Sequence, residues 1–236
     1  MYIKIFKRLL DLVFSVSALV VLSPLLLILS AIGAFAMKGN PFFVQPRPSK
    51  KGKDGKEKIF YLIKLRTMSN ACDANGEPLP DEQRIGKYGM WLRSTSLDEL
   101  PSLVNIVMAH LSIVGPRPFL VRDMIFMTEE QRRRHTVRPG LTGLAQVNGR
   151  NNITWEQKME YDLQYIDEGI TLAGDVKIIL QTISKVLKRS NTVRKGTVSD
   201  VDFGDWLMME GKITQEQYRT GQIRAKEILS PKEVSL

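Results

Sequence analysis

The chain has 236 residues and a formal net charge of +9 at pH 7. That length suits one domain of ordinary size with an appendage, and the charge indicates an anionic partner: nucleic acid, anionic lipid or a phosphorylated substrate. The single cysteine, Cys72, excludes an internal disulfide. No spacing of cysteine and histidine resembles a zinc site, so any metal here would be a hard ion held by oxygen atoms.

An uncharged, mostly apolar run of 26 residues, 12–37, follows the basic N-terminus. As a straight helix it would extend about 39 Å, more than the roughly 30 Å of a bilayer's hydrocarbon core. A soluble core helix is not usually apolar on every face, and the run is too long for the apolar part of a cleaved signal peptide. We therefore predict that residues 1–39 enter a membrane.

The charges on the two sides of this run bear on its topology. Three Lys or Arg residues precede it, and residues 38–58 carry seven against two acids. Positive residues favour the cytoplasm, so a single crossing would place one basic cluster on the wrong side. Proline bends or breaks a helix, and Ser23-Pro24 lies near the middle of the run. We predict a re-entrant helix-break-helix at Ser23 and Pro24; a crossing helix kinked at the proline is the alternative.

Residues 40–58 have the composition of a basic loop. We expect its lysine-rich turn, from Lys50 to Lys58, to be a solvated hairpin near anionic headgroups, with a merely soluble loop as the alternative. The segment from Phe60 to Leu65 is apolar and compatible with a strand, and Lys64 near its end is a candidate phosphate ligand. Residues 70–89 are polar and rich in turn-forming residues, which predicts a loop.

Two adjacent carboxylates, Asp98 and Glu99, open an apolar helical pattern. The structural interpretation is a capping box, in which Ser96 caps the helix and Glu99 reaches back to it. Acids near the start of a helix also suit its dipole.

The functional interpretation of the same pair depends on the cations around it. Arg93 lies five residues before Asp98, and Arg117 lies on the turn 115–118 that follows the helix. An acidic pair between fixed cations suits a metal-dependent phosphoryl site, where a carboxylate acts as ligand or nucleophile. We therefore place the candidate chemistry in this stretch.

Two basic stretches follow. We expect a short helix from Thr128 to Arg134, with the charged run 132–135 facing solvent or headgroups; a catalytic His135 is a minor alternative. Residues 137–150 are expected to form an irregular glycine-rich loop whose backbone approaches a phosphate. That loop presents four candidate phosphate or nucleotide ligands: Arg138, Gln146, Asn148 and Arg150.

Two amphipathic helices are predicted beyond this loop, at residues 155–167 and 175–189. The second carries several lysines, so it is a candidate interfacial helix, and a core-packed surface helix is an equal alternative. Residues 191–236 read as a polar tail with a charged helix at 213–229.

Several motifs occur together in one order: Lys64-Leu65-Arg66-Thr67-Met68, Ser96-Leu97-Asp98-Glu99-Leu100-Pro101, Gly115-Pro116-Arg117-Pro118 and Arg138-Pro139-Gly140-Leu141-Thr142-Gly143. With the basic start and the Ser23-Pro24 break, they resemble the bacterial sugar transferase family, which are monotopic phosphoglycosyl transferases. The likeness covers about residues 3–190. It is closest to the small single-domain members, such as the undecaprenyl phosphate diacetylbacillosamine 1-phosphate transferases.

The resemblance implies a reaction in which sugar 1-phosphate moves from a UDP-sugar to undecaprenyl phosphate and UMP is released. It also implies Mg²⁺ as cofactor and an aspartyl-phosphosugar intermediate. In this chain it implies that Asp98 is the nucleophile, with Glu99 as its partner through the metal. It further implies phosphate and nucleotide contacts from Lys64, Arg93, Arg117 and Arg138.

The chain departs from the family's pattern at two places. Ala109-His110 stands where Gly-Asp is common, so any ligand role of that acid is absent. Ser49 stands where many members have glycine, and a lysine-rich insertion follows it, which could alter membrane contact or acceptor fit.

We thus predict an α+β fold, mostly helical with a small β element, in a monotopic membrane protein with amphipathic interfacial helices. Residues 1–39 form the re-entrant helix, 40–190 the catalytic domain and 191–236 the tail. The expected location is the cytoplasmic face of the bacterial inner membrane. The expected partners are a UDP-sugar, undecaprenyl phosphate and anionic lipids, not nucleic acid, and a homodimer is left open.

Two other functions are kept as alternatives. A membrane-tethered nucleic-acid-binding protein would suit the charge, but the sequence contains no recognisable reader of bases. A catalytically inactive scaffold for glycan assembly would keep the fold and lose turnover.

Overall fold

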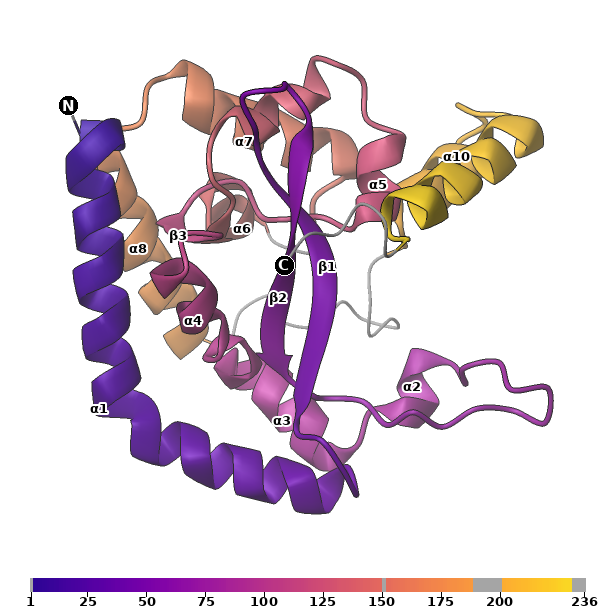
Figure 1. Cartoon of the computed structure of the whole chain (residues 1–236), viewed down its shortest axis with the longest axis horizontal. Helices are drawn as coiled ribbons and strands as arrows, with labels where there is room; N and C mark the ends of the chain where they lie inside the picture. The colour runs from indigo at the N-terminus through magenta and orange to yellow at the C-terminus, as the bar shows by residue number, and fades with distance from the viewer. Residues whose placement is uncertain (1, 150–151, 189–200, 231–236) are drawn as a thin grey trace.

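The computed structural model describes residues 2–149, 152–188 and 201–230. The fold is mostly helical with two small sheets, as predicted, and Figure 1 shows its course. In chain order the elements are the π-helix η1 (Tyr2–Phe6), α1 (Lys7–Ala36), β1 (Phe42–Lys51), β2 (Glu57–Leu65), α2 (Asp81–Arg84), α3 (Lys87–Thr95), the 3-10 helix η2 (Leu97–Glu99), α4 (Ser102–Val107), β3 (Ser112–Val114), α5 (Val121–Ile125), the 3-10 helix η3 (Gln131–Thr136), β4 (Gly140–Thr142), α6 (Leu144–Asn148), α7 (Trp155–Asp167), α8 (Leu172–Leu187), α9 (Phe203–Met209) and α10 (Gln215–Ile228).

The N-terminal apolar run forms one helix of 30 residues, α1, that is long and apolar enough to cross a membrane. The predicted break is a bend, because the helix continues through Pro24 and turns as Figure 1 shows. Pro24 has no N–H for the carbonyl of Val20, four residues earlier, and Ser23 Oγ donates to that carbonyl at 2.8 Å. The serine therefore satisfies the acceptor that the proline leaves open.

The start of α1 is bound to the rest of the chain by its cations. Lys7 Nζ pairs with the buried carboxylate of Asp175 on α8 at 2.5 Å. The Arg8 guanidinium donates to the carbonyls of Ile106 and Val107, at 2.5 and 2.8 Å. Those carbonyls lie in the last turn of α4, where the helix dipole favours a cation. Two of the basic residues that precede the apolar run thus bind protein groups.

Further contacts hold α1 along its length. The buried Asp11 carboxylate accepts from Ser112 Oγ and from the Ile113 N–H of β3, at 2.7 and 3.0 Å. Beyond the bend, Tyr88 Oη on α3 donates to the Leu29 carbonyl at 2.6 Å. Both parts of the helix therefore pack against the same body, one beside α4 and α8 and the other beneath α3 (Figure 1).

Strands β1 and β2 form an antiparallel hairpin with its turn in the lysine-rich segment, which confirms the predicted hairpin. The expectation of a loop at residues 40–51 was wrong, because β1 pairs along this segment despite Pro46 and Pro48. Prolines are tolerated here because a two-stranded sheet has only edge strands. The buried residues Phe60 and Leu62 of β2 pack against Leu103 and Ile106 of α4.

Strands β3 and β4 run parallel and bring the turn 115–118 against residues 140–142. A Cβ atom on Gly140 would lie 2.1 Å from the Gly115 backbone nitrogen, and one on Gly143 would lie 2.2 Å from the Gly115 carbonyl oxygen. Glycine is therefore required for two backbones to meet. The expected irregular loop instead contains β4 and α6, and Gly140 and Gly143 approach the protein's own backbone.

The predicted capping box is wrong. Ser96 has a left-handed backbone (φ 58°) that ends α3, and its side chain makes no capping hydrogen bond to η2. The single helix expected after Ser96 is divided into η2 and α4, with Pro101 preceding α4. The Glu99 side chain is therefore available for contacts elsewhere. Helix α3 lies before η2 and begins inside the segment 70–89 that was predicted to be a loop.

The basic run 132–135 is largely buried, contrary to the expectation of a surface. Arg134 pairs with Asp162 of α7, and each side chain is only 1% exposed. His135 Nδ1 lies 3.2 Å from Glu57 Oε1, and Arg132 pairs with the same carboxylate at 3.3 Å. The run is a 3-10 helix between the hairpin and α7, so acids from both sides neutralise it.

The two predicted amphipathic helices are present. The first has the predicted bounds, and the second, α8, begins three residues before the expected Asp175. Every third or fourth residue of α8 is an exposed apolar side chain: Leu172, Val176, Leu180, Ile183 and Leu187. This stripe has the geometry of an interfacial helix face.

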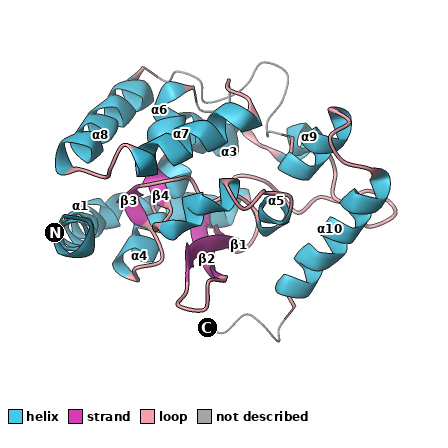
Figure 2. Cartoon of the chain, turned by 90° about the horizontal axis from the view of Figure 1, so that it is seen from above, coloured by secondary structure: helices cyan, strands magenta, loops and turns pink. Residues whose placement is uncertain are grey.

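The predicted C-terminal helix is α10, and a further helix, α9, precedes it. Both pack on α5, at the opposite end of the molecule from α1 (Figure 2). Phe203 is 2% exposed and lies in a cluster with Phe119 and Trp155. Its N–H donates to Asp123 Oδ1 at 2.9 Å, and Asp123 Oδ2 accepts from the Leu120 N–H.

Candidate active site

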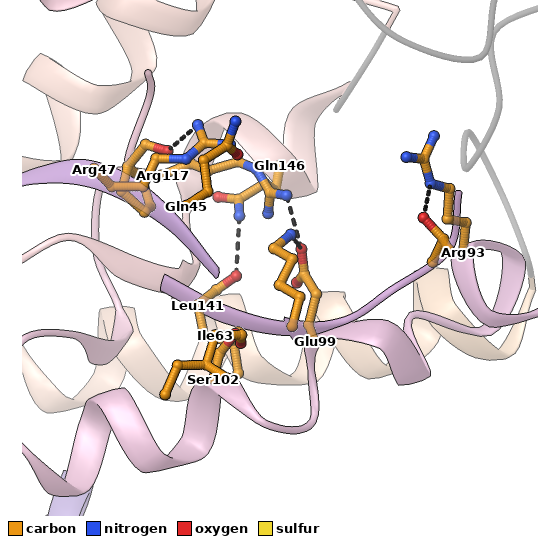
Figure 3. A network of polar contacts seen from close by, with 12 residues as sticks. Gln45, Arg47, Ile63, Arg93, Glu99, Ser102, Arg117, Leu141 and Gln146 are labelled. Atoms are coloured by element: carbon orange, nitrogen blue, oxygen red, sulfur yellow. Dashed lines mark hydrogen bonds and ion pairs between the residues drawn. The ribbon is translucent and has the colours of Figure 1, made fainter. Parts of the chain in front are cut away.

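Glu99 is the centre of a cation cluster drawn from three elements. Its Oε1 accepts from Lys64 Nζ of β2 at 2.6 Å and from Arg117 Nη2 of the turn 115–118 at 2.7 Å (Figure 3). Strand pairing sets Lys64 opposite Phe43, on the face that also carries Arg47. The structure thus brings together three predicted site residues, Lys64, Glu99 and Arg117.

Charge and burial act in opposite directions on this cluster. Burial by itself would raise the pKa of Glu99, but Arg117 and Lys64 outweigh it and hold that pKa far below its usual range. Burial lowers the pKa of Lys64, and the charge of Glu99 opposes that shift. Glu99 is therefore a fixed anion that orients two cations rather than a group that exchanges protons.

Asp98 differs from its neighbour. Burial, and then the adjacent Glu99 charge, raise the pKa of the Asp98 carboxyl, while Lys64, Arg117 and Arg93 oppose the shift. Within the part of the chain that the structure describes, no hydrogen-bond or ion-pair partner of Asp98 is found. A partly buried carboxylate without such a partner is poised to react or to bind a cation.

Arg93 lies apart from the Glu99 cluster (Figure 3). Its Nε donates to Thr67 Oγ1 at 3.0 Å, at the end of β2, and its charge acts on Asp98. Burial lowers the pKa of Arg93. The charges of Arg93, Lys64 and Arg117 thus all act on Asp98.

The turn that carries Arg117 is held at three successive carbonyls. That of Pro116 accepts from the Gly140 N–H at 2.9 Å, and that of Pro118 from Arg47 Nη1 at 3.0 Å. The Arg117 carbonyl accepts from Arg134 Nη2 at 2.5 Å. Because three different elements bind it, the turn is pre-organised.

A cavity of about 250 Å³ opens beside Glu99 and Arg117. Apolar side chains form most of its wall: Leu100, Leu103, Ile113, Leu141, Val147, Ile179, Ile183 and Val186. Gln146, Thr182 and Lys185 add polar groups. The cavity reaches α8, whose Ile183 belongs both to its wall and to the exposed apolar stripe.

A second, small cavity lies on the other side of Glu99 and is lined by Arg47, Lys64, Ser102 and Arg117. Arg47 was not among the predicted site residues. Its guanidinium also donates to Gln45 Oε1 at 2.6 Å. Burial and the Arg117 charge lower the pKa of Arg47 to about 10. Alternation along a strand from Gln45 to Arg47 would have found it, had a strand been predicted there.

The remaining candidate ligands are placed differently. Gln146 lines the cavity and donates to the Leu141 carbonyl at 3.1 Å (Figure 3). Arg138 Nε donates to the Ala109 carbonyl at 3.0 Å, and the exposed Asn148 amide donates to the carbonyl of Leu144. Arg150 lies outside the described residues. Of the three candidates that the structure describes, only Gln146 lines the cavity beside Glu99.

The two departures from the family pattern meet in space. Ser49 is buried, and its Oγ donates to the His110 carbonyl at 3.0 Å. The His110 ring packs on Phe60, with ring centroids 5.8 Å apart. Ser49 and His110 therefore contact each other, and this contact joins β1 to the segment that follows α4.

The site offers few ligands for a metal. In the described residues, no group of three or more His, Cys, Asp or Glu side chains could hold an ion. Asp98 and Glu99 supply two adjacent carboxylates, and Mg²⁺ is commonly held by one or two carboxylates together with substrate phosphates and water. The donor set therefore fits Mg²⁺ that arrives with a phosphorylated substrate.

Comparison with known proteins shows the family of this chain. The profile of the bacterial sugar transferase family matches residues 2–189. The chain belongs to the bacterial sugar transferase family. This confirms the resemblance seen in the sequence, although no comparison tests which member is nearest in substrate.

Individual relatives of this sugar transferase include short and long proteins. A Bacillus subtilis (strain 168) protein named uncharacterized sugar transferase EpsL is 44% identical over 183 residues, which is 78% of this chain and 88% of that protein. The UDP-glucose:undecaprenyl-phosphate glucose-1-phosphate transferase of Klebsiella pneumoniae is 37% identical, and the match covers 77% of this chain but 40% of that protein. The Sinorhizobium fredii exopolysaccharide production protein ExoY is 32% identical, over 76% and 84% of the two chains.

Proposed function

We propose that this chain transfers a sugar 1-phosphate from a UDP-sugar to undecaprenyl phosphate and releases UMP, at the cytoplasmic face of the inner membrane. The observation that carries the proposal is an Asp98 carboxylate without a partner in the described residues, beside a fixed Lys64–Glu99–Arg117 cluster. The names of the Klebsiella and Escherichia coli (strain K12) relatives support the donor and acceptor classes. The product would start the assembly of a glycan.

The proposed chemistry has two displacements at phosphorus. An Asp98 carboxylate oxygen attacks the sugar-linked phosphorus, the bond from that phosphorus to the bridging oxygen breaks, and UMP leaves with the electron pair. A phosphate oxygen of the lipid then attacks the same phosphorus, and the bond to Asp98 breaks. Splitting the reaction in this way avoids bringing two anionic substrates together at once.

The cations around Asp98 match the charge that this reaction develops. Arg117 and Lys64 are held by Glu99, so they can bind donor phosphate oxygens without reorganising. Arg93, which lies apart from that cluster and whose charge also acts on Asp98, would act on the leaving phosphate. Bound Mg²⁺, held by Asp98 and Glu99, would supply further neutralisation of the diphosphate.

The way α1 is held supports a proposal for how the protein sits in the membrane. Its first turns and its last third both bind one body, through Lys7 and Arg8 at one end and the Leu29–Tyr88 contact at the other. The apolar side chains flanking the bend are among its most exposed, with Val21 at 73% and Leu27 at 71%. We therefore propose that the bend dips into the bilayer and returns, so that the protein is monotopic.

Purified wild-type protein with Mg²⁺, undecaprenyl phosphate and a panel of UDP-sugars tests the reaction through UMP release. We expect release with at least one donor, and a loss of about 100-fold or more for Asp98→Asn. The exposed hairpin variant Asp54→Asn is the matched control and should retain activity. With labelled donor and no acceptor, wild type but not Asp98→Asn should retain phosphosugar on the protein.

Absence of release with every donor would contradict the proposal and favour the inactive scaffold. Turnover that requires both substrates together, with no labelled protein, would contradict the covalent route. The nucleic-acid alternative drew on the net charge and on the run 132–134, of which Arg134 is buried. It would gain support only from salt-dependent DNA binding without UMP release.

A further inference from the structure

The buried ion pair between Arg134 and Asp162 lies behind the site and touches neither cavity. Arg134 is on η3 and Asp162 on α7, so the pair joins two elements from outside the catalytic stretch. Arg134 Nε and Nη2 donate to Asp162 Oδ2 at 3.0 and 2.5 Å, and both side chains are 1% exposed. Burial of two charges has a large desolvation cost, so a pair this deeply buried is weak evidence for a role in stability alone. The pair also holds other groups in place.

The guanidinium has a second acceptor. Arg134 Nη2 also donates to the carbonyl of Arg117 at 2.5 Å, and its carbon lies 3.8 Å from the centre of the Phe119 ring, two residues further along. One planar group thus fixes the backbone and the ring on both sides of Pro118. A guanidinium can hold a carboxylate and a carbonyl in fixed directions at once, which an ammonium cannot.

The position of this carbonyl decides where the Arg117 side chain begins. Pro116 and Pro118, on either side, have no N–H to anchor the turn. Apart from the Gly115 N–H, which donates to the Thr142 carbonyl at 2.9 Å, the turn is held by its carbonyls. Those of Pro116 and Pro118 bind Gly140 and Arg47, and the one between them binds Arg134. Loss of the middle contact would free the residue whose guanidinium holds Glu99.

We propose that Arg134 and Asp162 are positioning residues for the transfer reaction: Asp162 orients Arg134, and Arg134 fixes the Arg117 carbonyl so that the Arg117 side chain is aimed at Glu99 and the donor phosphate. The inference rests on the proposed function. It predicts that the pair affects turnover only through Arg117.

The test is a set of variants in the full-length protein, assayed for UMP release. Arg134→Met with Asp162→Leu replaces the buried pair by apolar side chains, a change that proteins often tolerate without loss of stability. We expect kcat/KM for the donor to fall by about 10-fold to 100-fold, since small displacements of a positioned group are costly. In an Arg117→Ala background, the same double change should alter kcat/KM by less than about twofold.

A merely structural role would give a different result, namely the same loss with or without Arg117. Equal losses in the two backgrounds, or no loss when Arg117 is present, would overturn the proposal. If the apolar double variant does not fold, Arg134→Lys replaces it in both backgrounds, because lysine keeps a charge opposite Asp162 and lacks the fork. Failure of the proposed function is distinct, since wild-type protein would then release no UMP.

Discussion

Ala109, two residues after the end of α4, has a left-handed backbone with φ at 65°. For a residue with a Cβ this conformation costs roughly 1–2 kcal/mol, and only glycine adopts it without strain. The glycine that the family commonly has at this position is therefore explained by the backbone. The Ala109 carbonyl also accepts from Arg138, which keeps the strained conformation in place.

We expect Ala109→Gly to raise the free energy of unfolding by about 0.5–1 kcal/mol, because relief of the strain exceeds the added entropy of the unfolded chain. Urea unfolding in detergent micelles measures this. Ala145→Gly, inside α6, is the matched control and should lower stability by about 1 kcal/mol, since glycine is unfavourable within a helix. A less stable Ala109→Gly protein would show that this backbone is not strained.

His135 is a buried residue whose charge state affects stability. Burial, aided by Arg134 and Arg132 and opposed by Glu57, lowers its pKa to about 4. The native protein therefore binds a proton less readily than the unfolded chain, where the pKa is about 6.5. The stability that this group contributes is fully present above pH 6.5 and is lost as the pH falls through about 4.

Between pH 7 and pH 4 the wild-type free energy of unfolding should decrease by on the order of 3 kcal/mol through this residue. The decrease should be smaller in His135→Gln, which cannot take up the proton. Urea titrations of both proteins at several pH values measure the difference. Parallel pH profiles would show that His135 does not control acid stability.

The elements differ in how far the sequence specified them. Helix α7 matches its predicted bounds because a Thr154 capping box and an amphipathic pattern both mark it, and these are local signals. The segment after Arg93 was mispredicted, because the contacts of Glu99 with Lys64 and Arg117 compete with the cap and are remote in sequence. Helix α9 was missed because it is placed by tertiary packing of Phe203, Trp206 and Leu207 against the cluster that holds Phe119 and Trp155.

Helices α9 and α10 lie after residue 189, where the match to the family profile ends. Residues of α9 nevertheless belong to the hydrophobic cluster that contains Phe119 and Trp155. Phe203→Ala should lower the free energy of unfolding by about 3 kcal/mol, because the side chain is buried against the Trp155 and Trp206 rings. Met209→Ala, on the same helix but 75% exposed, should change it by less than about 0.5 kcal/mol. Similar small effects of both substitutions in thermal or urea unfolding would mean that α9 does not belong to the folded core.

At the scale of the whole molecule, α1 and the stripe on α8 expose large apolar side chains. Exposure of such extended apolar surface to water is unfavourable and marks an interaction with a membrane or another protein. Contacts at both ends of α1 bring residues 5 and 40 to one body. A re-entrant helix keeps both positions on the cytoplasmic side, whereas a crossing helix separates them.

Cysteines placed at Ile5 or Asn40, in a Cys72→Ser background, distinguish the two topologies. With a membrane-impermeant maleimide we expect both to react in inverted vesicles and neither in right-side-out vesicles. Cys72 in the wild type, exposed on the loop before α2, marks the side of the catalytic domain. Opposite accessibility of the two introduced cysteines would establish a crossing helix.

The sequence by itself determined the apolar helix, its bend at Ser23-Pro24, the mostly helical fold and the Asp98–Glu99 pair, because each depends on composition or on neighbours within a few residues. Only the tertiary structure decided that Lys64 and Arg117 share Glu99, that Arg47 and Arg134 hold the Arg117 turn, and that Arg138 and Asn148 lie elsewhere. Charged side chains take whichever partner folding brings within reach, and in those contacts the partner is 17 to 71 residues away. Spacing in the sequence cannot supply that information.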